Sequence, residues 1–422
     1  MINADRLYEI QQQLFDRNRD KIVSGLERIE AAAMDCSNPQ FAYNVVHVAG
    51  TNGKGSTASM IAQGLAAAGE KTGLFTSPHI LHFGERFRIN GEIVPAQKWL
   101  GVYDDLNEIC ERRGLTFFEI STLIAFEMFR RENCSWVVIE TGMGGRLDAT
   151  NICVPKVSVI TSIGIDHTDY LGTTIEEITN EKLGIVKRGV PLVISGANSE
   201  KVIRQAQNYC KKTDSQCIVS DLTRVRNVAN SENPPEICLD LKNFYKLAMS
   251  GDFQKTNFIL ALTAMEYLGL GKREEIIEAI TETSVAARMQ TFKIDGKSVV
   301  FDVAHNPQAM QNLMESAAKE NFKKPIGLIF GMMNDKDTKE TMKFAVSIAE
   351  NIFCFTPATK RAQPADYTAY DFRKLGAKNV FVCKSACEAL EKAVSTDETV
   401  LVCGSFYVVS EVMVAANIEI CE

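Results

Sequence analysis

The segment VVHVAGTNGKGSTASM, residues Val45 to Met60, is the stretch from which the fold is inferred. Its apolar start has the length of a strand, and its glycine-rich middle suits a tight turn. The residues that continue from its end, SMIAQGLAAAG (residues 59–69), are typical of a helix. This order is that of a phosphate-binding loop, in which main-chain N–H groups turn toward an anion at the positive end of a helix. We therefore expect Gly50, Gly53 and Gly55 to shape an anion site and Lys54 to supply a mobile positive charge.

The segment departs from the usual phosphate-loop pattern at two positions. That pattern is Gly, four free residues, Gly-Lys, and then Ser or Thr. Here Val48 stands at the opening position, and Gly55 follows Lys54. A plain glycine turn with a solvated lysine is the alternative, but three glycines between a strand and a helix favour a nucleotide site. Because no hydroxyl follows Lys54 directly, a metal ion that accompanies the nucleotide needs other ligands.

Apolar runs of strand length alternate with helical stretches over two long regions of the chain. The runs are continuous, which is typical of parallel strands covered by helices on both faces. We expect an α/β fold of two domains, residues 1–292 and 293–422, with the less regular segment 196–250 along an edge. The runs are NVVHVA, KTGLFTS, SWVVIE, VSVITS and VPLVIS in the first region, and SVVFDVAH, PIGLIFGM, NIFCFTPA, NVFVCK and TVLVCGS in the second.

Composition excludes several classes of protein. The net charge is −7, and acidic and basic residues are interleaved, so there is no basic stripe for nucleic acid or for an anionic membrane surface. The start, MINADRLYEIQQQLF, does not resemble a leader peptide, and no apolar run approaches the ~20 residues of a membrane span. We expect a cytoplasmic protein. Its 12 cysteines form no C-x-x-C pair, so we expect mostly small buried side chains rather than a zinc site or disulfides.

Three polar residues at the ends of apolar runs are candidate metal ligands. Ser77 follows KTGLFTS, Glu140 ends WVVIE, and His167 stands beside Asp166 after VSVITS. In a doubly wound sheet, ligands collect outside the carboxyl ends of the strands, so these residues are expected in the same crevice as the glycine loop. Magnesium prefers oxygen ligands, and a structural histidine is the alternative for His167. A carboxylate and a hydroxyl on neighbouring strand ends favour the metal site.

The motifs that carry these residues resemble one known family. GTNGKGS, TSPH followed by ERFRINGE, ETGMGGRLDATN, DHTDYLG, EKLGIVK, FDVAHNP, GMMNDKD and VLVCGSF occur in the order seen in folylpolyglutamate synthases and dihydrofolate synthases, which belong to the Mur ligase superfamily. The resemblance runs from about residue 25 to residue 406. It implies an N-terminal phosphate-loop ATPase domain of the Mur ligase type with a folate or pteroate site, and a smaller, Rossmann-like C-terminal α/β domain.

The resemblance also implies an activity. Members of this family use ATP to phosphorylate a folate-type carboxylate, and the amine of L-glutamate then attacks the acyl phosphate. ATP is a co-substrate and Mg²⁺ the cofactor, with a monovalent cation as a further candidate; the other substrates are L-glutamate with dihydropteroate, a reduced folate, or both. A monomer is expected. The family carries GTNGKG followed by Ser or Thr in place of the strict phosphate-loop pattern, which accounts for the departures noted above.

The site residues implied by the resemblance fall into four groups. Lys54, Lys182 and His167 are the expected catalytic residues, and Ser77, Glu140 and His167 the expected metal ligands. The expected ATP site consists of Gly50, Thr51, Asn52, Gly53, Lys54, Gly55 and Ser56, with Asn257 at the adenine, Arg288 at the phosphates, and Asp302 and His305 at the ribose and phosphates. The expected pteroate site consists of Leu26, Arg28, Phe118, Glu119, Leu147, Asp148 and Ala149.

Several of these assignments have alternatives. Lys182 is either carbamylated, and then an anionic metal ligand, or an unmodified cationic clamp, or a lysine on a helix surface. Asp302 is also placed to cap a helix before NPQAM. Phe118 is equally typical of a core residue. The family has Pro-Gly-Arg where this chain has Ala286-Ala287-Arg288, and more often has Ala where this chain has Leu183; the first change bears on the geometry of the arginine and the second on packing.

Three functions compete. The first is a folate–glutamate ligase, bifunctional or restricted to one step. The second is a cell-wall Mur ligase that acts on a UDP-sugar peptide. It predicts an additional N-terminal domain of roughly one hundred residues, whereas only about forty residues precede the loop. The third is a nucleotide-dependent switch protein, which gives no reason for a second nucleotide-contacting α/β domain. The sequence favours the first.

Overall fold

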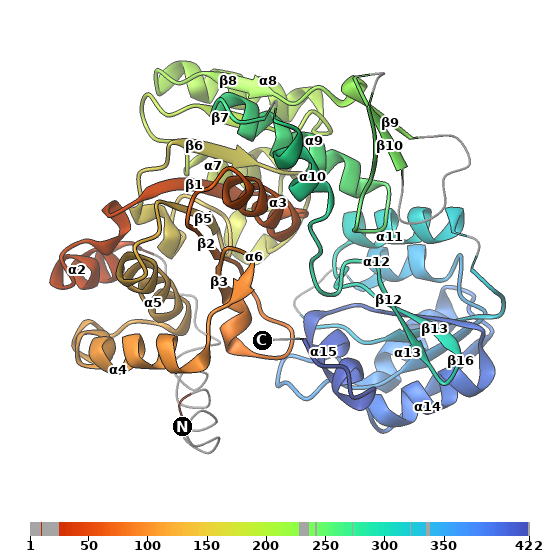
Figure 1. The fold of residues 1–422 in the computed structure, drawn as a ribbon. Coiled ribbons are helices and arrows are strands. Elements are labelled where there is room, and N and C mark those ends of the chain that lie inside the picture. Colours follow the sequence, from red (N-terminus) through yellow and green to blue (C-terminus); the bar gives the residue numbers. More distant parts are fainter. Residues whose placement is uncertain are drawn as a thin grey trace.

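The computed structural model describes residues 10, 25–227, 236–240, 243–271, 273–320, 322–334 and 338–420. Within these residues the chain forms two α/β lobes that lie side by side (Figure 1). We call residues 25–289 the first lobe and residues 290–420 the second lobe. Apart from residue 10, the stretch MINADRLYEIQQQLF, on which the expectation about a leader peptide rests, lies outside the described residues, as do residues 335–337 of the GMMNDKD motif.

The first lobe is built on a mainly parallel sheet, as expected. Its strands are β1 (Asn44–Ala49), β2 (Thr72–Phe75), β3 (Phe87–Ile89), β4 (Glu92–Ile93), β5 (Trp136–Glu140), β6 (Val157–Ile160), β7 (Leu192–Ile194) and β8 (Cys217–Val219). They follow the order β4-β3-β2-β5-β1-β6-β7-β8. Six neighbouring strands of this order run parallel, namely β2, β5, β1, β6, β7 and β8. At one edge, β3 pairs antiparallel with β2, and β4 pairs antiparallel with β3. The central position of β1 places its carboxyl end, and the glycine loop after it, in the middle of the sheet edge.

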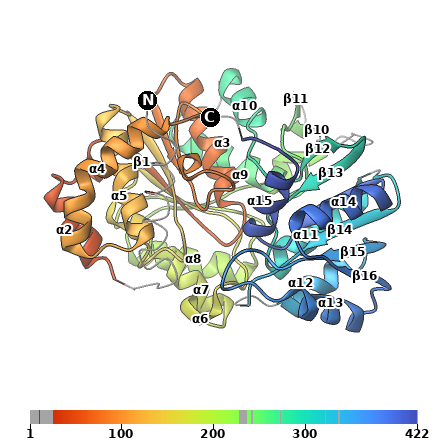
Figure 2. The same ribbon diagram turned by 90° about the horizontal axis from the view of Figure 1, so that it is seen from below.

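Helices cover both faces of this sheet (Figure 2). They are α2 (Glu27–Asp35), α3 (Lys54–Ala67), α4 (Ala96–Arg113), α5 (Phe117–Arg131), α6 (Thr168–Leu171), α7 (Ile175–Leu183), α8 (Glu200–Lys212), α9 (Phe253–Tyr267) and α10 (Glu274–Thr281), with short 3₁₀ turns η1 (Pro39–Phe41), η2 (Phe83–Arg86), η3 (Ala149–Ile152) and η4 (Leu222–Arg224). Successive strand residues point to opposite faces. In β5, Val137 and Ile139 therefore pack with α2, α4 and α5, and Val138 packs with α3, α9 and α10.

The segment 196–250 is more regular than the sequence suggested. Besides α8 and β8 it contains β9 (Val225–Asn227), β10 (Glu236–Leu239) and β11 (Asn243–Lys246), which form a small antiparallel sheet in the order β11-β10-β9. Ile237 and Leu239 of β10 are buried in the same core as α9 and α10. These strands are short and lie among polar residues, which is why their apolar pattern is weak in the sequence.

The second lobe repeats the architecture on a smaller scale. It contains β12 (Gln290–Ile294), β13 (Lys297–Phe301), β14 (Ile326–Phe330), β15 (Asn351–Cys354), β16 (Asn379–Val382) and β17 (Thr399–Cys403), with α11 (Pro307–Lys319), α12 (Thr338–Ala345), α13 (Ala365–Lys374), α14 (Ala386–Thr396) and α15 (Phe406–Ala415). The strand order is β12-β13-β17-β14-β15-β16, and only β12 is antiparallel to its neighbour among the described strands. Leu328 and Phe330 pack with α11 to α13, and Ile329 packs with α14 and α15.

The expected division between residues 292 and 293 falls inside β12, which pairs with β13 of the second lobe. We propose a division before Gln290, because it keeps the second sheet whole. Alternate residues of β12 are half-buried and exposed, so this antiparallel edge strand has no continuous apolar run. The sequence signal of the second lobe is therefore strong only from β13 onward.

In the described part of the chain, no helix has both the length and the apolar character that crossing a membrane requires. The eleven cysteines that the structure describes are free thiols, and seven of them are buried. Among these residues, the cysteines therefore behave mostly as small apolar side chains, as their scattered spacing predicts.

Candidate active site

A cavity of about 540 Å³ lies between the two lobes. The loop after β1, the ends of β2 and β5, the loop after β6, and helix α7 border it from the first lobe; the loops after β13 and β17 border it from the second. The structure brings together here all residues expected to bind ATP or metal, together with Lys182; their roles remain predictions. These residues are Gly50, Thr51, Asn52, Gly53, Lys54, Gly55, Ser56, Ser77, Glu140, His167, Lys182, Asn257, Arg288, Asp302 and His305.

The glycine loop leaves the start of α3 open. Its N-cap residue, Gly53, has φ 85° and no side chain to occupy the helix N–H groups. A Cβ atom at Gly53 would lie 2.4 Å from Oδ1 of Asn257. The main-chain oxygen of Asn52 accepts hydrogen bonds from the hydroxyls of Thr161 (2.7 Å) and Ser162 (3.1 Å), which anchor the loop to the end of β6. The loop is therefore held in a shape that presents main-chain donors to the cavity.

Two lysines border the loop. Lys54 donates to the carbonyl oxygen of Thr51 at 3.2 Å, and Lys182 donates to that of Gly50 at 2.7 Å. Burial, together with the charge of Lys54, lowers the pKa of Lys182 to about 7, although Asp166 and Asp148 act in the opposite direction. Only 3 % of Lys182 is exposed, so the alternative of a lysine on a helix surface is wrong.

Glu140 is a buried carboxylate at the end of β5. Its Oε2 accepts the main-chain N–H of Ser77 at 3.0 Å. Burial raises the pKa of Glu140, whereas the nearby charges of Lys54, Arg288 and Arg86 lower it. A cation bound beside this carboxylate would compensate for its loss of hydration.

The metal set expected from the sequence fits this site chemically. The hydroxyl of Ser77, the carboxylate of Glu140 and the imidazole of His167 are oxygen and nitrogen donors that a divalent cation accepts. Among the described residues, no group of three or more His, Cys, Asp or Glu residues is arranged to hold a metal ion. A metal ion held by Ser77, Glu140 and His167 would take its further ligands from phosphate oxygens or water.

Arg288 reaches the cavity from the segment that connects the lobes. Its guanidinium lies 5.7 Å from the centre of the Phe406 ring and donates to the carbonyl oxygen of Ala287 at 3.2 Å. Ala287 has φ 53°, so it adopts the left-handed conformation that favours glycine, and glycine stands at this position in the Pro-Gly-Arg motif of the family. The substitution has therefore not displaced the arginine from the cavity.

Asp302 supports the same segment. Its two carboxylate oxygens accept the main-chain N–H groups of Met289 (2.9 Å) and Ala304 (2.8 Å). Burial raises its pKa, and the charge of Arg288 opposes that shift. The alternative that Asp302 caps the following helix is wrong, because the N-cap of α11 is Asn306. The carboxylate of Asp302 instead holds the turn that carries Arg288.

The residues expected to bind pteroate lie beside this cavity rather than on its wall. Ala149 is part of the core formed by α2, α4 and α5, and Leu26 and Phe118 pack against that core. Leu147 is 38 % exposed. Phe118 approaches the cavity most closely, since a Cβ atom at Gly142 would lie 2.5 Å from its ring and Gly142 itself lines the cavity.

The three charged residues of this set are bound to protein groups. Arg28 forms an ion pair with Glu119 at 3.0 Å, and Glu119 also closes the N-terminal capping box of α5. Asp148 accepts the main-chain N–H and the hydroxyl of Thr150 at 3.0 and 2.5 Å, and the N–H of Met143 at 2.8 Å. Because Met143 lines the cavity, Asp148 fixes the loop that separates the cavity from the expected pterin region.

Sequence reasoning missed the contacts between the lobes and one buried arginine. Asn306 and Gln308 of the second lobe bond to Asn52 of the glycine loop. Arg86 lines the cavity, is 5 % exposed, and donates from Nε to Nδ1 of His79 at 2.9 Å. The Asn-Pro pair in FDVAHNP is a helix-start signal that could have identified Asn306 as a cap; its contact with the first lobe leaves no local signal.

Comparison with family models places this geometry in a class. The model described as the Mur ligase middle domain matches residues 48–265, and the model described as the Mur ligase glutamate ligase domain matches residues 287–406. The fold, the glycine loop and these two matches define an ATP-dependent ligase of the Mur ligase type.

Individual relatives narrow the class. The chain is 31 % identical over 416 residues to the dihydrofolate synthase/folylpolyglutamate synthase of Haemophilus influenzae, with 92 % of each chain covered. Escherichia coli FolC in complex with DHPP and ADP superposes with a TM-score of 0.86, 28 % identity and 97 % of each chain covered. A bifunctional folylpolyglutamate synthase/dihydrofolate synthase with Mn, AMPPNP and L-glutamate bound superposes with a TM-score of 0.84 and 27 % sequence identity, and 98 % of each chain is covered. The chain belongs to the dihydrofolate synthase/folylpolyglutamate synthase family of Mur ligases.

Proposed function

We propose that the protein is a bifunctional ligase that joins L-glutamate to dihydropteroate and to reduced folates at the expense of ATP. The observation that carries this proposal is the cavity between the lobes, which combines an open glycine loop with the buried carboxylate of Glu140 and with three cationic side chains, Lys54, Arg86 and Arg288. The buried Lys182 lines the same cavity. The similar proteins named above support the choice of substrates.

The arrangement suits the formation of an acyl phosphate. A carboxylate oxygen of the pterin substrate attacks the γ-phosphorus of ATP, and ADP leaves. The two reactants are both anions, so positive groups must lie where they meet. Lys54 and Arg288 are placed to do this, because both are close enough to Glu140 to lower its pKa. In the second step the amino nitrogen of glutamate attacks the acyl carbon, inorganic phosphate leaves and the amine loses a proton.

Ser77, Glu140 and His167 are the residues that would hold Mg²⁺. The ion would supply positive charge to the phosphate oxygens of ATP. Support comes from the buried position of Glu140 and from the Mn bound in the similar bifunctional synthase. This proposal includes Mg²⁺ as the ion and a further monovalent cation. It also includes a cytoplasmic location, which rests on composition, and a monomeric state, which rests on the family resemblance.

Lys182 is proposed to act in its carbamylated form. Only a neutral amine adds CO₂, and a buried lysine with a pKa of about 7 is neutral in a large fraction of molecules near neutral pH. The alternative is a cationic clamp on the phosphates. Both forms are compatible with the hydrogen bond from its amine to Gly50.

Arg86 is proposed to receive a substrate carboxylate. It is buried at the cavity wall, and its guanidinium lies 5.2 Å from the ring centre of Phe117 and 5.6 Å from that of Phe83. Two aromatic faces and His79 hold the guanidinium in one orientation. A fixed guanidinium is well suited to a carboxylate because it offers parallel N–H donors.

The first experiment follows glutamate incorporation and ADP release by the purified protein with ATP and Mg²⁺, with dihydropteroate and tetrahydrofolate in parallel reactions. Product from both acceptors supports the bifunctional enzyme. Product from tetrahydrofolate alone supports the second candidate, a monofunctional folylpolyglutamate synthase. If neither acceptor drives glutamate-dependent ADP release, the folate assignment is wrong, although membership of the ligase family is unaffected.

A further inference from the structure

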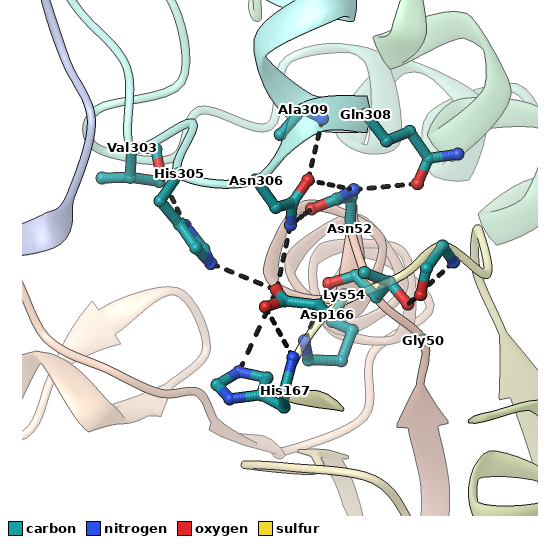
Figure 3. A network of polar contacts seen from close by, with 12 residues as sticks. Gly50, Asn52, Lys54, Asp166, His167, Val303, His305, Asn306, Gln308 and Ala309 are labelled. Carbon is teal, nitrogen blue, oxygen red and sulfur yellow. Dashed lines mark hydrogen bonds and ion pairs between the residues drawn. The ribbon is translucent and has the colours of Figure 1, made fainter. Parts of the chain in front are cut away.

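The two lobes are joined beside the glycine loop by a pair of asparagine side chains (Figure 3). Asn52 belongs to the loop of the first lobe, and Asn306 stands at the start of α11 in the second lobe. The amino group of Asn52 donates to Oδ1 of Asn306 at 3.3 Å, and the amino group of Asn306 donates to Oδ1 of Asn52 at 3.0 Å. This reciprocal pair requires both amide groups to face each other, so a small displacement of either lobe would break it.

Asn306 also holds the loop that follows β6. Its amino group donates to Oδ2 of Asp166 at 3.0 Å, and Asp166 accepts the main-chain N–H of His167 at 2.9 Å through its other oxygen. Nε2 of His305 lies 3.5 Å from the same Oδ2. One side chain of the second lobe therefore contacts both the glycine loop and the loop that carries the candidate metal ligand His167.

The orientation of Asn306 is fixed by its second role as a helix cap. Its Oδ1 accepts the N–H of Ala309 at 2.9 Å, and Pro307 occupies the first helical position. Because the oxygen must face the helix, the amino group must face Asp166 and Asn52. Only 2 % of Asn306 is exposed, so water cannot replace these partners easily.

The rest of the interface is close-fitting at this point. Gln308 accepts a hydrogen bond from the amino group of Asn52 at 3.0 Å. A Cβ atom at Gly164 would lie 2.5 Å from Oε1 of Gln308, so the loop after β6 approaches the second lobe as closely as a glycine allows. The Asn52 main chain is itself anchored to Thr161 and Ser162. The interface thus has little freedom to rearrange without losing the bonds of Asn306.

We propose that Asn306 is a positioning residue that locks the second lobe onto the glycine loop. His305, and Asp302 with the Arg288 turn that it holds, then face the nucleotide site only while Asn52 and Asp166 hold Asn306. The inference rests on the proposed function, because the alignment it provides is that of a nucleotide shared between the lobes. Asn306 acts through these contacts and is not a catalytic residue.

The substitution Asn306→Asp separates the lock from the helix cap. Aspartate caps helices as well as asparagine does, so α11 keeps its N-terminal hydrogen bond. A carboxylate at position 306 has no donor for Asp166 and repels it. We expect kcat to fall by about 10- to 100-fold, which corresponds to the loss of a charge-assisted hydrogen bond, with a melting temperature within a few degrees of the wild type. Asn306→Ser, which also keeps a capping oxygen but is too short to reach Asp166, should lose activity in the same direction.

The exchanged pair Asp166→Asn with Asn306→Asp restores one donor opposite one acceptor. Under the proposal, the kcat of this double variant is at least tenfold higher than that of Asn306→Asp. A tenfold change in kcat corresponds to about 1.4 kcal/mol, the contribution of one restored hydrogen bond. Small-angle X-ray scattering with a non-hydrolysable ATP analogue supplies an independent measure. The radius of gyration should increase in Asn306→Asp relative to the wild type and return toward the wild-type value in the double variant.

Ser385→Ala is the matched control. Ser385 caps α14, a helix of the same lobe, through the N–H of Glu388 at 3.2 Å and does not line the cavity. Its loss should lower the melting temperature and leave kcat and the radius of gyration unchanged.

Three results would overturn the proposal: a kcat of Asn306→Asp within twofold of the wild type, an unchanged radius of gyration, or no recovery in the exchanged pair. Failure of the proposed function looks different, because the wild type itself would then show no glutamate-dependent ADP release with either acceptor. In that case the scattering comparison of the wild type, Asn306→Asp and the exchanged pair still decides whether Asn306 locks the lobes.

Discussion

The helices α3 and α11 each follow the carboxyl end of a parallel strand, α3 after the central strand β1 of the first lobe and α11 after β13 of the second lobe. Their first turns are used in different ways. At α3 the N-cap is Gly53, which has no side chain, and the residues of the first turn, Lys54, Gly55 and Ser56, line the cavity. At α11 the N-cap is Asn306, whose oxygen takes the N–H of Ala309. One helix start is available to a ligand, and the other is closed by the chain itself.

This difference divides the work between the lobes. An open helix start attracts anions through its main-chain donors and its dipole. A capped start contributes through the side chains around it, here His305 and Asp302 on the preceding loop and the amino group of Asn306. Two similar strand–turn–helix units therefore carry different chemistry, and the distinction depends on one residue at each N-cap.

The strongest test of the open helix start is Lys54→Ala. We expect ligation to fall by about 1000-fold, because the meeting point of the triphosphate and the carboxylate loses a preorganised cation. The melting temperature should change little, since among the described residues the hydrogen bond of the Lys54 side chain is to the carbonyl of Thr51 in its own loop. Steady-state ADP release measures the effect. Lys71→Ala, which removes an exposed lysine paired with Glu132, is the control and should retain wild-type activity; near-normal activity of Lys54→Ala would remove the loop from the mechanism.

Gly53→Ala tests the shape of the same helix start. An added Cβ atom meets Asn257 at 2.4 Å, and φ is 85°. We expect nucleotide affinity to fall by about 10- to 100-fold, because strain of roughly 1–2 kcal/mol adds to the collision with the expected adenine residue. Gly69→Ala is the matched control: φ is 91°, yet a Cβ atom there meets nothing within 4 Å. Titration with a fluorescent ATP analogue should show wild-type affinity for Gly69→Ala, and equal losses in the two variants would attribute the effect to strain alone.

Acidification should distinguish the lobes. Burial, with a smaller contribution from Lys187, lowers the pKa of His47 in β1 from its ordinary value of 6.5 to about 3. Between these values the unfolded chain binds a proton that the folded chain does not, so stability is lost as the pH falls below 6.5. The expected loss from this group between pH 7 and pH 5 is roughly 2 kcal/mol. Both tryptophans, Trp99 and Trp136, lie in the first lobe, so their fluorescence during urea unfolding reports that lobe.

The control for this prediction is His47→Gln, which removes the titrating group. Its pH dependence between pH 7 and pH 5 should be smaller than that of the wild type by the same amount. An identical pH dependence in both proteins would show that the acid sensitivity of the first lobe arises elsewhere.

The smallest expected effect concerns the capped helix start. His305→Ala should raise the apparent KM for ATP by about tenfold, the amount expected for one lost hydrogen bond, and leave binding of the pterin substrate unchanged. The measurement is ADP release over a range of ATP concentrations, with pterin binding followed separately. An unchanged KM for ATP in a folded variant would show that the second lobe does not contact the nucleotide through His305.

Much of the site could be inferred from the sequence because its residues stand at the ends of strong local signals. Gly53 and Lys54 follow a continuous apolar strand and precede a helix, and Glu140 ends another such strand. The glycine loop and the carboxylate were therefore expected at the same sheet edge. The lobe boundary was harder to place because β12 alternates and has no apolar run. The alternative that Asp302 caps α11 was open in the sequence because two acceptors, Asp302 and Asn306, precede the same helix, and only the turn geometry selects Asn306.

The sequence by itself determined the alternation of the main apolar strands and helices in the two lobes, the glycine loop and its lysine, and the family to which the chain belongs. These depend on periodicity and on short motifs, in which the interacting residues are neighbours along the chain. Only the tertiary structure decided that Lys182 is buried, that Asp302 holds the turn of Arg288, and that Asn52 meets Asn306 across 254 residues of sequence. Contacts of this kind arise from the packing of one lobe on the other, and a pattern read along the chain contains no record of which distant side chains that packing brings together.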